Sequence, residues 1–237
     1  MANLKEIRSR ITSVGSTMQI TSAMKMVSAA KLKRAQDAII QMRPYANKLT
    51  ELLENLSVSL DSSDGGVYAQ NREIKNVLLV VITSNRGLCG GFNAYVLKQT
   101  NALIQEKYSE ANVSIISIGK KASEHFQKNG VNVISSHDEL FSDITFDNVA
   151  KIAEAIMNQF AAHNYDKVVL VYNQFKNAAT QIIMSENFLP IQAPESEGIV
   201  VGDYLFEPTK QEILDELIPK SLKTQLFKAV LDSHAAE

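Results

Sequence analysis

The sequence predicts an α/β protein in which the N- and C-terminal helices form a long antiparallel α-helical coiled coil beside a central Rossmann-like α/β domain. Apolar residues recur every seven positions from residue 4 to residue 56, and a second helical pattern occupies residues 207–237. Between them, strand and helix patterns alternate over residues 67–205. We therefore expect three parts: a coiled-coil helix over 1–60, the α/β domain over 67–205 and a shorter coiled-coil helix over 207–237.

The N-terminal helix is predicted from its heptad pattern. Residues 3–57 contain one proline and one glycine, and thirteen of sixteen heptad core positions are apolar. A pattern sustained over this length is typical of a coiled coil rather than of an ordinary surface helix. At 1.5 Å per residue the helix would be about 80 Å long, so it has to project beyond its own globular part. Pro44 is expected to kink the helix or unwind it locally.

This N-terminal segment is strongly basic. Residues 1–48 carry nine basic and two acidic side chains, which leaves a net charge of −9 on the other 189 residues. The asymmetry indicates either contact with an acidic partner or a helix face that is simply solvated.

Three consecutive heptad core positions in the basic segment are polar, namely Thr21, Lys25 and Ser28. The neighbouring Met24 and Met26 lie off the heptad core. The pattern fits a polar layer that sets the register of a coiled coil. It fits equally an adaptable methionine surface that faces a partner on another side.

A capping box of Thr209 and Glu212 begins the second helix, which we expect to pack antiparallel on the first. This helix can cover the longer one only down to about residue 28. It also lacks a stop signal at its end, as in a helix cut in its middle. An uncovered apolar stripe marks an interaction surface, so we expect another protein, further C-terminal residues, or both, to cover it. The uncovered stripe comprises Leu4, Ile7, Ile11, Val14 and Met18.

Between the two helices, residues 61–66 read as a linker, and strands then alternate with helices. The apolar run at 77–83 is typical of a buried parallel strand, and the alternation predicts a Rossmann-like sandwich. Further strands are expected at 113–118, 131–135, 168–175 and 180–185, the last two as a hairpin around Asn177, and helices at 94–108, 120–128 and 146–162.

The glycine-rich segment 83–93 follows the first predicted strand and opens the next helix, where α/β proteins bind phosphate. It matches neither the dinucleotide-binding nor the P-loop glycine pattern, and no lysine follows its glycines. A nucleotide site is therefore disfavoured, and a tight turn with positive φ is the simpler interpretation.

Residue types that carry catalysis are scattered. The four histidines lack metal-ligand spacing, no serine nucleophile elbow occurs, and the single cysteine, Cys89, excludes an internal disulfide. A nucleophilic role of Cys89 at a helix N-terminus is disfavoured against a small residue in a crowded turn. No uncharged apolar run is long enough to span a membrane, and no secretory signal is seen. We therefore expect no catalytic residue, no metal ion, no cofactor and no direct membrane insertion.

Four blocks of sequence, spread over nearly the whole chain, carry a family resemblance. Ile7–Val14, Ile20–Ala35, Ser84–Asn93 (SNRGLCGGFN) and Pro219–Leu231 closely resemble the gamma subunit of rotary F-type ATP synthases. The resemblance implies a central rotor shaft that couples ion flow through a membrane rotor ring to ATP synthesis or hydrolysis at beta-subunit sites. It also implies partners: alpha and beta subunits, the epsilon subunit and the rotor ring, and no nucleic acid.

Carried over residue by residue, the resemblance assigns two contact surfaces. The apolar stripe would lie inside the alpha and beta ring, and the basic and methionine residues would bear torque against acidic elements of beta. The glycine-rich loop would lie at the foot of the shaft, against epsilon and the rotor ring. The ring contact comprises Leu4, Ile7, Ile11, Val14, Met18, Met24, Lys25, Met26, Lys31, Lys33 and Arg34; the foot contact comprises Arg86, Gly87, Leu88, Cys89, Gly90, Gly91 and Phe92.

The sequence departs from the family at its end, because family members continue for several heptads beyond the position of Glu237. A start at Met1 without a transit peptide favours the cytoplasmic face of the bacterial inner membrane, with the chain as a peripheral part of the complex. Two alternatives stay open. A nucleotide-binding α/β enzyme with a helical oligomerisation arm should bind ATP or a dinucleotide, and a nucleic-acid-binding coiled coil should bind with a steep salt dependence.

Overall fold

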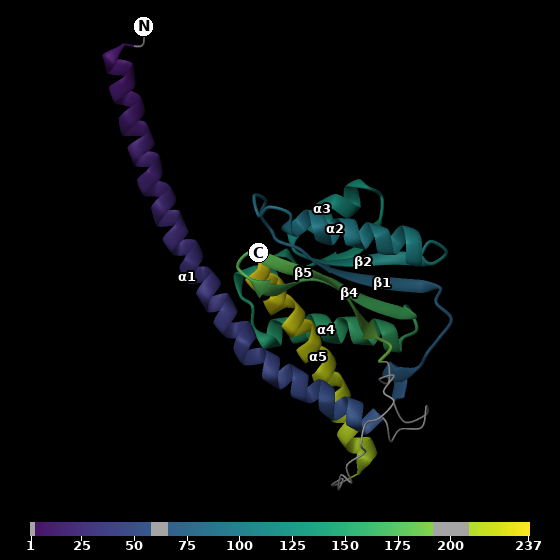
Figure 1. Ribbon diagram of the computed structural model, residues 1–237. Coiled ribbons are helices and arrows are strands. Elements are labelled where there is room, and N and C mark those ends of the chain that lie inside the picture. The colour runs from purple at the N-terminus through teal and green to yellow at the C-terminus, as the bar shows by residue number, and fades with distance from the viewer. Residues whose placement is uncertain (1–2, 58–65, 192–208) are drawn as a thin grey trace.

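The computed structural model describes residues 3–57, 66–191 and 209–237 (Figure 1). The expected linker and the three domain boundaries fall almost wholly outside these ranges and stay predictions. The helices are α1 (Leu4–Ser57), α2 (Phe92–Ala102), α3 (Lys120–Lys128), α4 (Phe146–Ala161) and α5 (Lys210–Ala236), with single turns η1 (Gly66–Ala69), η2 (Leu103–Lys107) and η3 (Asp138–Ser142). The strands are β1 (Asn76–Ile82), β2 (Asn112–Ile118), β3 (Asn132–Ser136), β4 (Lys167–Asn177) and β5 (Thr180–Leu189).

The strands form one sheet in the order β3-β2-β1-β4-β5. β1 lies at the centre, parallel to both neighbours, with Val77 opposite Val113 of β2 and Lys167 of β4. β3 is also parallel, whereas β5 returns antiparallel from β4 through a turn in which Asn177 Oδ1 accepts a hydrogen bond from the Ala179 amide. The Rossmann-like arrangement and the hairpin around Asn177 are therefore confirmed.

Helices cover both faces of this sheet (Figure 1). Successive side chains of a strand point to opposite faces, so β1 supplies two separate cores. Its odd-numbered residues 77–81 pack with α2 and α3, and its even-numbered residues 78–82 pack with α4 and α5. All of these side chains are fully buried, as a continuous apolar strand in the middle of a sheet requires.

Helix α5 packs against two partners at once. Leu222, Leu226 and Val230 enter the core between the sheet and α4, whereas Leu231 and Ala235 contact α1. The sequence predicts α5 only as the coiled-coil partner of α1, and its place on the sheet is not predicted. A helix between two apolar neighbours is apolar on most of its sides, which weakens the periodic signal that would reveal either neighbour.

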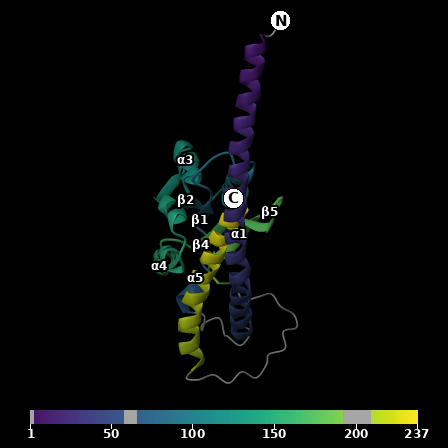
Figure 2. The same cartoon turned by 90° about the vertical axis from the view of Figure 1, so that its left-hand side faces the viewer.

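Helices α1 and α5 run antiparallel, as predicted (Figures 1 and 2). Among the described side chains of α1, the buried apolar residues all lie at predicted heptad core positions: Ala35, Ile39, Ala46 and Leu49. The end of α5 reaches Ser28 and Ala29 of α1, with which Ala236 lines a common groove. The predicted limit of coverage near residue 28 is thus confirmed.

Pro44 does not interrupt α1. The helix is continuous over Leu4–Ser57 and bends along the body, so of the two expected outcomes α1 shows a change of direction and no local unwinding (Figure 1). Pro44 is exposed, on the side of the helix away from α5. The proline ring lies on the solvent side and meets no packed neighbour. The bend of the helix opens toward solvent and accommodates the backbone hydrogen bond that proline cannot donate.

Two adjacent isoleucines of α1 offer a matched test of this packing. Ile39 is fully buried between α5 and β4, whereas the Ile40 side chain is 60% exposed. We expect Ile39→Ala to lower the free energy of unfolding by about 2–5 kcal/mol, because it leaves a cavity between the helices. Ile40→Ala should change it by less than about 0.5 kcal/mol. Urea unfolding of both variants would measure this, and equal losses would contradict the packing described here.

Candidate functional site

The N-terminal half of α1 is an apolar stripe without a partner in the described part of the chain. Leu4, Ile7, Ile11, Val14 and Met18 are between 44% and 73% exposed. In Figure 1 this half of the helix projects well beyond the α/β body. The structure thus places the five predicted stripe residues together on one free helix, as a surface that another protein could cover.

Below the stripe lies the basic segment. Met24 and Met26 are 64% and 67% exposed, which leaves both methionines free for contact. Lys25, Lys31 and Arg34 are also exposed, and Lys33 forms a 2.8 Å ion pair with Asp37 on the same helix. An exposed pair within one helix contributes little to stability, so these cations remain available to an acidic partner.

The glycine-rich loop is held by hydrogen bonds among its own residues. Ser84 Oγ donates to the carbonyl oxygen of Arg86 at 2.5 Å, and the Ser84 amide donates to Asn93 Oδ1 at 2.9 Å. Positive φ angles occur at Leu88 and Gly90, which confirms the predicted turn, although the first of these residues is not a glycine. The loop side chain of Leu88 is fully exposed at the tip.

One of the predicted loop contacts needs correction. Phe92 is only 2% exposed and begins α2 within the body, so its side chain is not available to a partner. Gly91 is partly buried beside the ring of Tyr95. The exposed part of the loop is therefore Arg86–Leu88 with Gly90, while the Cys89 thiol is partly buried and lies 3.1 Å from Asn93 Nδ2.

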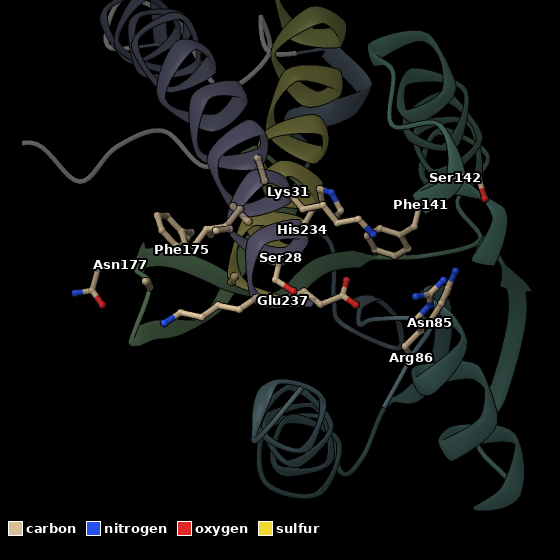
Figure 3. Close-up of a pocket in the computed structure, with 17 residues that line it drawn as sticks. Ser28, Lys31, Asn85, Arg86, Phe141, Ser142, Phe175, Asn177, His234 and Glu237 are labelled. Atoms are coloured by element: carbon tan, nitrogen blue, oxygen red, sulfur yellow. The ribbon is translucent and has the colours of Figure 1, made fainter. Parts of the chain in front are cut away.

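The loop lies close to α1. Asn85 and Arg86 face Ser28 and Lys31 of α1 across a groove of about 700 Å³ (Figure 3). This groove lies at the end of the body from which the free half of α1 projects, whereas the opposite end holds the start of α5 (Figure 1). Within this chain the loop therefore lies beside the projecting helix, because the carboxyl end of β1 points toward it.

The groove contains a histidine on α5, whose side chain is exposed at the groove wall. The His234 ring lies 6.1 Å, centroid to centroid, from that of Phe141, and Lys31 is nearby (Figure 3). Desolvation in the groove lowers the pKa of His234, and the charge of Lys31 lowers it further. No local sequence signal could have revealed this groove, since its walls come from α1, the loop, η3, the β4–β5 turn and α5.

This histidine predicts a dependence of stability on pH. A depressed pKa means that the unfolded chain, with an ordinary value of about 6.5, takes up the proton more readily than the folded one. The stability that depends on neutral His234 is therefore present above about pH 6.5 and is lost as the pH falls through the lower folded pKa. In urea unfolding at pH 7.5 and 5.5, His234→Gln should lose less stability than the wild type on acidification. An equal loss in both proteins would contradict a lowered pKa of His234 in the folded chain.

Within residues 3–57, 66–191 and 209–237, no three metal-ligating side chains come together. The described helices also include none that is both long enough and apolar enough to cross a bilayer. The potential nucleophile Cys89 has serine and asparagine neighbours but no histidine among its hydrogen-bond partners in the described structure.

Comparisons with known proteins agree with this description. The family model for ATP synthase matches residues 3–237. The ATP synthase gamma chain of Flavobacterium psychrophilum is 58% identical over all of this chain and 82% of its own length, and that of Christiangramia forsetii is 55% identical with the same coverage.

A solved structure shares the fold. The central stalk and c-ring structure of the Tetrahymena thermophila mitochondrial ATP synthase contains a chain with a TM-score of 0.68 and 24% identity, covering 92% of this chain and 93% of that one. At this identity the likeness concerns the fold alone, including the two terminal helices beside an α/β body. The family model and the two relatives show that the chain belongs to the gamma-chain family of ATP synthases.

Proposed function

We propose that this chain is the central rotor shaft of an F-type ATP synthase and that its free helix turns inside a ring of alpha and beta subunits. The observation that carries the proposal is the bare stripe of α1, which is apolar, helical and extends beyond the body. Burying such side chains is worth roughly 1.5–3 kcal/mol each, which favours a protein enclosure over water. ATP chemistry then belongs to the beta subunits, and this chain takes part through contact.

The proposed contact with the alpha and beta ring has two levels along α1. The stripe residues Leu4–Met18 lie inside the ring, and the basic segment below them meets acidic elements of beta at its lower rim. Exposed lysine and arginine side chains suit such a contact, because opposite charges steer and align two surfaces. The exposed methionines add an adaptable apolar component. The lower level comprises Met24, Lys25, Met26, Lys31, Lys33 and Arg34.

The glycine-rich loop joins this lower level rather than the foot. Arg86 lies across the groove from Lys31, so both cations are directed to the same rim. Leu88 offers an exposed apolar tip beside them. We assign the epsilon and rotor-ring contact to the opposite end of the body, where α1 ends and α5 begins, and we place the complex on the cytoplasmic face of a bacterial inner membrane.

A nucleotide-binding enzyme is the less favoured alternative. The polar groups of the loop bond to one another, since Ser84 and Asn93 exchange hydrogen bonds at 2.8–2.9 Å. Such a loop has few free donors for a phosphate. A nucleic-acid-binding coiled coil is disfavoured because an apolar stripe, and not a continuous basic face, occupies the most accessible part of α1.

Co-purification with alpha and beta subunits of the same organism tests the proposal. We expect one complex that contains a single copy of this chain per ring and hydrolyses ATP, whereas the isolated chain hydrolyses none. A chain that elutes alone and binds ATP or a dinucleotide would overturn the proposal in favour of the enzyme. Binding to DNA with a steep salt dependence would overturn it in favour of the nucleic-acid-binding alternative.

A further inference from the structure

One ion pair ties together three parts of the molecule. Arg43 Nη2 on α1 donates to Asp232 Oδ1 on α5 at 2.7 Å and to the carbonyl oxygen of Phe175 on β4 at 2.6 Å. The Asp232 side chain is 0% exposed and that of Arg43 is 34% exposed. A single nitrogen thus joins the long helix, the helix that covers the sheet and the end of a central strand.

This pair differs from the exposed ion pairs of the chain. Lys33–Asp37 and Lys121–Glu124 each join neighbouring turns of one helix, with carboxylates 48% and 47% exposed. Burial raises the pKa of the Asp232 carboxyl above its ordinary value, and the hydrogen bond and charge of Arg43 act against this. A carboxylate buried so completely persists as a charge only with its partner in place, so the two side chains act as one unit.

The apolar contacts around the pair do not fix direction. Ala35, Ile39, Leu231 and Ala235 meet near Phe175, close to the point where α1 leaves α5. Apolar packing depends on buried area and is not directional, so by itself it sets the angle between two helices less sharply than a hydrogen bond does. A guanidinium that donates to both a carboxylate and a carbonyl oxygen accepts only a narrow range of angles.

We propose that the Arg43–Asp232 pair is a positioning contact that sets the angle and register at which α1 leaves the body and so transmits torque between the two. The inference rests on the proposed shaft function. Because the free half of α1 is long, it amplifies any change of the helix angle at Arg43. At 1.5 Å per residue, a tilt of about 5° at Arg43 would displace Leu4 by about 5 Å. Such a shift would move the stripe out of place against its ring, while the ring and its catalytic sites stay intact.

The test uses the whole ATP synthase in membrane vesicles and measures ion pumping and ATP hydrolysis in parallel. We expect Arg43→Ala and Asp232→Asn to lower the ratio of pumping to hydrolysis at least threefold, with hydrolysis within twofold of the wild type. Asp232→Asn keeps the shape of the side chain, so its ratio of pumping to hydrolysis tests the inference if Arg43→Ala does not assemble. The control is Lys223→Ala, which removes an ion pair between α5 and α4 that lies within the body and should leave the ratio unchanged.

A double variant separates positioning from stabilisation. Replacing both partners by apolar residues, Arg43→Met with Asp232→Leu, often restores stability because no unpaired charge stays buried. We expect this variant to unfold at the wild-type temperature and still to pump poorly for each ATP hydrolysed. Restored pumping would overturn the inference, as would wild-type ratios in both single variants. A wild-type complex that neither assembles nor pumps would instead overturn the shaft function, and the inference with it.

Discussion

Replacing Gly119 by alanine should destabilise the α/β body by more than about 4 kcal/mol, enough to prevent normal folding. Gly119 follows β2 with a φ of 105°, and a Cβ atom there would lie 1.9 Å from the carbonyl oxygen of Thr83. Thr83 cannot move aside. Its amide donates to Ile118, and its hydroxyl accepts the Ala122 amide at the start of α3. The substitution therefore combines a strained φ with a backbone collision between the ends of two central strands.

Thermal unfolding followed by circular dichroism would measure the effect. Gly87→Ala is the matched control, because a Cβ atom there meets nothing within 4 Å. That control should unfold within about 2 °C of the wild type, in line with the small effects of surface substitutions. A Gly119→Ala protein that unfolds at the wild-type temperature would show that the β1 and β2 ends are farther apart than described.

The double substitution Ile11→Gln with Val14→Gln should weaken assembly with the alpha and beta ring by about 100-fold or more. Both residues are 68% exposed, so the isolated chain should keep its stability to within about 0.5 kcal/mol. In the ring each loses a burial energy of roughly 1.5–3 kcal/mol. Since 1.4 kcal/mol corresponds to a tenfold change in affinity, the two losses together give the expected factor.

Native mass spectrometry of the co-purified complex at decreasing concentration would measure this loss. The control is Thr12→Gln with Ser13→Gln, which changes two residues between Ile11 and Val14 that lie off the apolar stripe. Equal dissociation of the two double variants would show that the ring does not distinguish the stripe from the rest of the helix. A complex that stays intact with both double variants would show that the stripe does not contact the ring.

Much of the fold could be predicted because local chemistry determines it. The predicted N-cap is present, with Thr209 Oγ1 accepting the Glu212 amide at 3.3 Å, and helix α3 begins and ends where its pattern predicts. The helix expected at 94–108 is different, because α2 ends at Ala102 and a π-helical turn follows over Leu103–Lys107. A change from four-residue to five-residue hydrogen bonding leaves the apolar pattern nearly unaltered, so the sequence carries little sign of it.

The site was less predictable than the fold. The stripe on α1 could be found because its spacing alone reveals an uncovered face. The proximity of Arg86 to Lys31 could not be predicted from the sequence, since it depends on the angle at which the terminal helices cross the sheet. The Arg43–Asp232 pair was missed for a similar reason. Asp232 follows the apolar Val230 and Leu231 on a buried side of α5, but its partner lies almost the whole chain away.

The packing of α5 against both the sheet and α1 has a consequence for biosynthesis. The ribosome makes α1 before the sheet and the sheet before α5, and the core on the α4 side of the sheet combines β1 with Leu222, Leu226 and Val230. Until those residues emerge, the nascent chain exposes one apolar face of a nearly complete sheet together with an unpaired α1. Domains fold as units, and exposed apolar surface promotes aggregation. The body therefore reaches its native state only after α5 has emerged from the ribosome, and chaperones that shield nascent chains have most to protect before that point.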